Sequence, residues 1–60
     1  MQESDIHVYA RELWKARGPK AIAEAAQKAA GFEKNSDREQ AHRWRRIEEI
    51  LIQIRGPRQA

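Results

Sequence analysis

The absence of cysteine from a chain of only 60 residues constrains its fold more than any other sequence feature. A domain of this length buries only about 60% of the surface that its unfolded chain exposes, so a disulfide or a metal commonly supports such a fold. Without cysteine there is neither a disulfide nor a thiolate metal site. We therefore expect a single domain over residues 1–60, stabilised by one packed core together with self-association or docking on a larger partner.

Two turn signals divide the sequence into three helix-forming segments. Gly18 suits a helix end, and Pro19 suits the first turn of the next helix. Ser36 and Glu39 match a capping box at the start of the last segment. Apolar residues recur three and four positions apart, whereas strand-like alternation is absent. The predicted helices lie near 4–17, 19–33 and 37–55, and a polar tail follows at 56–60. The fold class is all-α, a small three-helix bundle or helical hairpin.

The last predicted helix carries the strongest apolar pattern. With successive residues about 100° apart, its apolar sector spans roughly 200°, against about 100° for an ordinary surface helix. We expect Ile50 and Ile52 to remain exposed and to form a homodimer contact through this helix. The alternative is one exposed isoleucine, which needs no explanation. The predicted core is Ile6, Tyr9, Leu13, Trp14, Ile22, Phe32, Trp44, Ile47, Leu51 and Ile54.

The same helix has a basic polar face in a chain whose net charge is +3. Arg38, His42, Arg45 and Arg46 share that face and could neutralise phosphates of a nucleic acid. A solvated face with intrahelical ion pairs is the competing interpretation, and the spacing favours it. The predicted pairs are Glu39 with Arg43, Arg45 with Glu48 or Glu49, and Arg46 with Glu49. A helix-turn-helix motif is not matched, because the connection before residue 37 is longer than its short turn.

Catalytic and metal chemistry find no support in the sequence. His7 and His42 lie on different predicted helices without the spaced partners of a zinc site. The two serines suit helix caps, and no glycine-rich loop could hold a phosphate. We expect a non-enzymatic protein without cofactor or metal. No apolar run approaches the roughly 20 residues of a membrane-spanning helix, and the N-terminus lacks the features of a secretory signal. We expect a cytoplasmic location and no membrane contact.

The order of Leu13-Trp14, a polar turn, and then Ala41, Trp44, Arg45 and Ile47 is similar to a group of short, uncharacterised bacterial helical proteins. That group has Leu-Trp in its first helix and Ala-x-x-Trp-Arg-x-Ile opening its last. Asn35-Ser36 replaces the glycine turn expected there. The resemblance covers about residues 10 to 55 and implies a helical fold, but it brings no activity and no binding residues.

These observations favour a protein-interaction module, namely a small adaptor, regulator or inhibitor that uses its third helix as the contact face. The expected contact residues are Ile50, Ile52, Arg43, Arg45 and Arg46. The expected partner is a second copy of the chain, another protein, or both. The alternative is a dimeric nucleic-acid-binding protein that contacts phosphates through the basic face described above.

Overall fold

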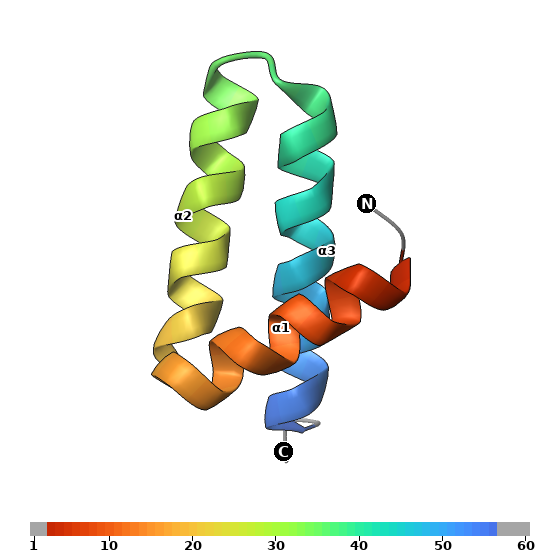
Figure 1. Cartoon of the computed structure of the whole chain (residues 1–60). Helices are drawn as coiled ribbons and strands as arrows, with labels where there is room; N and C mark the ends of the chain where they lie inside the picture. Colours follow the sequence, from red (N-terminus) through yellow and green to blue (C-terminus); the bar gives the residue numbers. More distant parts are fainter. Residues whose placement is uncertain (1–2, 57–60) are drawn as a thin grey trace.

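A computed structural model describes residues 3–56, apart from the side chain of Glu3, and contains three α-helices (Figure 1). They are α1 (Glu3–Arg17), α2 (Lys20–Lys34) and α3 (Arg38–Arg55), and the described residues form no strand. The predicted all-α fold is therefore confirmed, with each helix end within one residue of its predicted position. Most of the predicted polar tail, at 57–60, lies outside the described residues.

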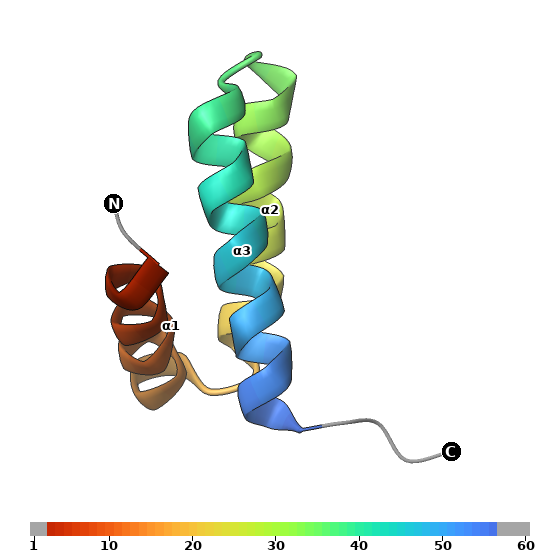
Figure 2. The ribbon, with the colours of Figure 1, turned by 90° about the vertical axis from the view of Figure 1, so that its right-hand side faces the viewer.

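The three helices form a hairpin with one crossing helix. α2 and α3 run side by side in opposite directions, and α1 crosses them near the start of α2 and the end of α3 (Figure 1). Seen after a 90° turn, α1 lies on one face of the hairpin, beside the C-terminal half of α3 (Figure 2). α3 therefore packs against α2 on one side and α1 on another, while the end of the hairpin that holds the connecting loop has only two helices.

A glycine and a proline make the sharp turn between α1 and α2. Gly18 has a φ of 62°, a conformation that glycine adopts without steric cost, and its N–H donates to the carbonyl of Trp14 at 2.7 Å. Pro19 follows in a helical conformation at the N-cap of α2, where its missing N–H removes no intrahelical bond. The predicted boundary at these two residues is confirmed.

The turn between α2 and α3 closes one helix and starts the next within three residues. Ser36, with a φ of 62°, donates its N–H to Glu33, and Asp37 donates its N–H to Phe32. This pair of bonds is the Schellman motif, in which the left-handed position usually belongs to glycine. Asp37 is also the N-cap of α3, since its side chain accepts from the N–H of Gln40 at 3.3 Å. The predicted capping box at Ser36 and Glu39 is wrong, because the cap lies one residue later.

The core lies where α1 crosses the hairpin. Ile47 and Leu51 of α3 are its largest fully buried side chains, and α2 contributes alanines that allow the helices to approach closely. The buried cluster consists of Ile6, Ala10, Ala21, Ala25, Ile47, Ile50 and Leu51, with Leu13, Trp14, Ile22 and Trp44 packed against it. Ala29 and Ala41 are also buried but lie outside this cluster, nearer the hairpin loop.

Seven of the ten predicted core residues are partly buried or exposed. Tyr9 is 41% exposed and Ile54 is 36% exposed, while Phe32 is half-buried. Tyr9 lies at the edge of the core and meets the ring of Trp44 edge-to-face, with a centroid distance of 5.8 Å. The ammonium of Lys28 lies over the same Trp44 ring, 5.6 Å from its centroid. This is a favourable distance for a cation–π interaction. These rings cover the core from outside instead of filling it.

Candidate functional site

The predicted contact surface on α3 is smaller than the sequence suggests. Ile50 is only 2% exposed, so the prediction that it is exposed and available for a partner is wrong. The physical reason is the position of α1, which crosses one face of the hairpin beside the C-terminal half of α3 (Figure 2) and covers part of the wide apolar sector within the chain. Ile52 is 39% exposed and remains accessible. The motivation for a dimer therefore now rests on Ile52.

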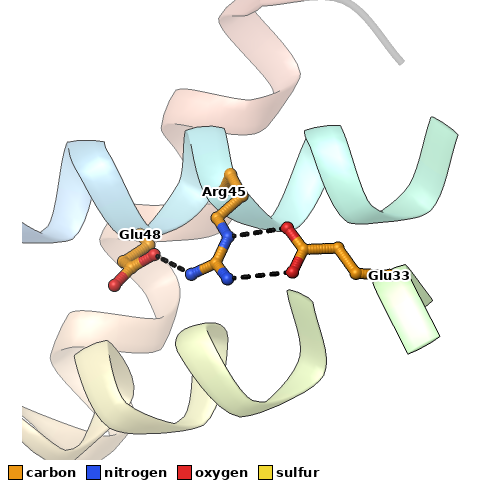
Figure 3. Close-up of polar contacts among 3 residues, drawn as sticks. All are labelled: Glu33, Arg45 and Glu48. Carbon is orange, nitrogen blue, oxygen red and sulfur yellow. Dashed lines mark hydrogen bonds and ion pairs between the residues drawn. The ribbon is translucent and has the colours of Figure 1, made fainter. Parts of the chain in front are cut away.

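Arg45 is held by two carboxylates (Figure 3). Its Nε and Nη2 donate to the two carboxylate oxygens of Glu33 on α2, each at 3.1 Å, and its Nη1 donates to Glu48 at 3.1 Å. The hydrogen bonds that Glu33 accepts from Arg45 lower the pKa of the Glu33 carboxyl. The pKa of the Arg45 guanidinium is raised by its hydrogen bonds to Glu33, which have the larger effect, and to Glu48. Such fork-to-fork geometry fixes the guanidinium plane more firmly than a single contact would.

Two other arginines of α3, Arg43 and Arg46, also have acceptors. Arg46 pairs with Glu49 at 2.8 Å, as predicted. Arg43 donates to the side-chain oxygen of Gln40 at 3.2 Å, and no ion pair with Glu39 is among the described contacts. For Arg45, the predicted pair with Glu48 is confirmed, whereas its partner on α2 was missed because sequence spacing reports only neighbours on the same helix.

An open pocket of about 530 Å³ lies on the loop end of the hairpin. Its lining includes Arg38, His42 and Arg45, which are three of the four residues predicted for a nucleic-acid contact. Glu33 lines the same pocket and neutralises Arg45 there. The fourth predicted residue, Arg46, is not part of this lining. The structure therefore brings most of the predicted basic set together, but with a carboxylate among them.

A second pocket, of about 380 Å³, lies between α1 and the last turns of α3. Its lining residues are Arg11, Trp14, Lys15 and Ile54. Neither Arg11 nor Lys15 forms an ion pair with any carboxylate among the described side chains. This pocket was not predicted from the sequence. Its sequence signal is the spacing of Arg11 and Lys15, two cations four residues apart that lie on one side of a helix. We call it the α1–α3 groove.

The described residues show no metal centre and no membrane-spanning helix. Among residues 3–56, no three side chains of the metal-binding types gather closely enough to hold an ion. Of the helices that the structure describes, none is both long and apolar enough to cross a bilayer.

No protein-family model, no curated protein and no solved structure matches this chain. The similarity to short bacterial helical proteins therefore stays an expectation, and the function is argued from the geometry of the chain itself.

Proposed function

We propose that this chain is a non-enzymatic protein-interaction module that contacts its partner through the exposed side of α3, centred on Ile52. The observation that carries this proposal is the exposure of Ile52 on a helix whose preceding isoleucine and leucine are buried. Arg45 and Glu48 lie seven and four residues before Ile52, on the same side of the helix. An apolar side chain bordered by charged groups has the composition of a small contact patch with a polar rim.

The partner that suits this patch best is a second copy of the chain. In a two-fold symmetric dimer, the patch of one copy packs against the identical patch of the other. Along α3 the patch carries a cation at Arg45, then carboxylates at Glu48 and Glu49, and then Ile52. When two such helices meet in opposite directions with their Ile52 side chains packed together, the charged residues that precede Ile52 in each copy lie on opposite sides of the contact, so the like charges of the two copies stay apart. A cytoplasmic location accompanies this proposal, because a chain without cysteine has no disulfide to lose in a reducing compartment.

Sedimentation equilibrium between about 1 µM and about 1 mM protein, at low and high salt, tests the proposal. The expected result is a dimer that persists at high salt and that Ile52→Gln converts to a monomer. Val8→Gln is the matched control, because Val8 is also an exposed aliphatic residue, at 58%, but belongs to α1. A wild-type chain that stays monomeric throughout, or a dimer unaffected by Ile52→Gln, would reject self-association through this patch.

The alternative function is nucleic-acid binding at the pocket lined by Arg38, His42 and Arg45. The observation that favours it is their convergence on one concave surface. Affinity for a mixed-sequence duplex would then fall steeply with salt, and the double variant Arg45→Ala/Arg46→Ala would bind more weakly than the parent. The pairing of Arg45 with Glu33 opposes this function, since a phosphate would have to compete with a carboxylate already in place.

A further inference from the structure

We propose that the α1–α3 groove is a second contact surface that binds an acidic, amphipathic peptide segment of a protein partner. The inference rests on the proposed function in that the chain acts by contact. It concerns a different surface from the patch around Ile52, because Ile52 and Ile54 lie about 200° apart around α3.

The two cations of the groove, Arg11 and Lys15, differ from several other cations of the chain in having no carboxylate partner among the described side chains. The guanidinium groups of Arg45 and Arg46 already have carboxylate partners on α3 or α2, and Arg17 pairs with Glu24 at 2.8 Å. Arg11 and Lys15 have no such partner among the described side chains, and none of the described residues that line the groove carries a carboxylate. Their charge is therefore available to an external anion, whereas the charges of Arg17, Arg45 and Arg46 are already compensated.

The spacing of Arg11 and Lys15 also opposes the stability of α1. Like charges four residues apart destabilise an isolated helix by about 0.2–0.5 kcal/mol. Lys15 lies in the last turn of α1, where the helix dipole favours a cation. Arg11 lies more than a turn earlier, where that effect has faded. An acidic partner would relieve the repulsion between the two cations.

The floor of the groove is apolar. Trp14 and Ile54 line the groove, Trp14 is only partly buried, and Ile54 is 36% exposed. Val8 lies three and seven residues before the two cations, so it extends the same ridge of α1 with an exposed aliphatic side chain. A volume of about 380 Å³ falls within the range of roughly 300–1,000 Å³ of pockets that hold a ligand.

Two cations at the rim and an apolar floor suit a peptide better than a nucleic acid. Two cations are few for a nucleic acid, whose binding proteins commonly make about 6–10 phosphate contacts. An indole and an isoleucine side chain offer nothing specific to a phosphate, but they suit a large apolar side chain. A segment with one or two apolar residues flanked by aspartate or glutamate satisfies both the floor and the rim of the groove. Its carboxylates would raise the association rate and fix the orientation.

The test begins with a library of short random peptides displayed on phage and selected against the intact chain. Peptides enriched in acidic and large apolar residues are the expected result. A synthetic, labelled copy of the leading peptide is then titrated by fluorescence anisotropy. We expect Arg11→Glu/Lys15→Glu to weaken its binding by at least about tenfold, because both substitutions replace a cation with a carboxylate that repels the acidic peptide. The indole N–H resonance of Trp14, and not that of Trp44, should shift on titration.

The matched control is Lys34→Glu/Arg38→Glu, which makes the same change in net charge at the opposite end of the hairpin (Figure 1). We expect this control to change the affinity by less than about twofold, because charges far from the groove are screened by salt. A small change would show that the loss in Arg11→Glu/Lys15→Glu does not come from net charge alone. Circular dichroism establishes that both variants remain helical. An equal loss in the two variants would overturn the groove as the binding site.

Other outcomes also overturn the inference. They are an enriched set that is not acidic, no enriched peptide at all, or a duplex that displaces the peptide from the groove. Each of these leaves the self-association experiment unaffected, because that experiment depends on Ile52 and is read as mass. Conversely, a chain that is monomeric but binds the acidic peptide would reject the dimer while supporting the groove.

Discussion

Arg45 binds two carboxylates at once, and this changes what the basic side of α3 is able to bind. In isolation the run from His42 to Arg46 has the composition of a phosphate-binding helix. In the folded chain, Glu33 of α2 reaches the same guanidinium (Figure 3) and opposes an added anion. A residue on another helix thus decides the chemistry of a motif that looks complete in the sequence.

The ion pair between Glu33 and Arg45 predicts a pH-dependent contribution to stability. Because the folded pKa of Glu33 is lowered, its contribution is present above the ordinary glutamate pKa of roughly 4.3 and is lost as the pH falls through the folded value. Glu33→Gln should therefore lower the melting temperature at pH 7 and make a smaller difference near about pH 3. Glu12→Gln, at an exposed glutamate of α1 without a described ion pair, should have little effect at either pH. A Glu33→Gln effect that is equal at both pH values would contradict the assignment.

Ser36 predicts a stabilising substitution. A left-handed conformation costs a non-glycine residue about 1–2 kcal/mol, and its φ of 62° places it there. Ser36→Gly should raise the free energy of unfolding by about 1 kcal/mol, measured by urea denaturation. Asn35→Gly is the control, because Asn35 has a φ of −89°, where glycine only adds freedom to the unfolded chain and should destabilise. A Ser36→Gly variant no more stable than the parent would refute the strain argument.

At the scale of elements, α2 differs from its neighbours because its buried face is built from alanine. Ala21, Ala25 and Ala29 are fully buried at spacings of four residues. They bury little apolar area each, so α2 contributes through close approach to α3 and not through large side chains. The larger side chains Ile47, Ile50 and Leu51 are all supplied by α3.

This packing predicts that α2 tolerates enlargement on one side only. Ala25→Leu should destabilise the chain by about 1–3 kcal/mol, because the added atoms must displace a neighbouring helix. Ala23→Leu places the same side chain on an exposed position of the same helix and should stay within about 0.5 kcal/mol of the parent. Urea denaturation followed by circular dichroism measures both. Equal effects at the two positions would mean that α2 and α3 are not closely packed.

The helices could be predicted from the sequence because their signals are local. Gly18, Pro19 and the polar run before Arg38 mark the ends within one residue. The burial of Ile50 could not be predicted, since it depends on which face of the hairpin α1 crosses. The same limit applies to the pair of Glu33 with Arg45 and to the groove between α1 and α3. In each case the missing information is a contact between segments far apart in the chain.

At the scale of the whole molecule, 60 residues leave little margin of stability. Leu51→Ala should cost about 2–5 kcal/mol, which is comparable with the few kcal/mol that a single small core supplies. We expect this variant to be largely unfolded at 25 °C by circular dichroism. Ile52→Ala, at the next residue but with an exposed side chain, should remain folded with a change within about 0.5 kcal/mol. A folded Leu51→Ala variant of near-parental stability would show that the core is not centred on this residue.

The crossing of α1 over only one end of the hairpin makes the molecule unequal along its length. Near the start of α2 and the end of α3, three helices share the isoleucine and leucine core. Near the loop, two helices meet through Ala29 and Ala41 and through the clasp of Glu33 on Arg45. Opening of the loop end therefore exposes little apolar surface and is less costly than opening of the crossed end. The loop ends of α2 and α3 can therefore separate locally while the core at the crossing of α1 stays intact.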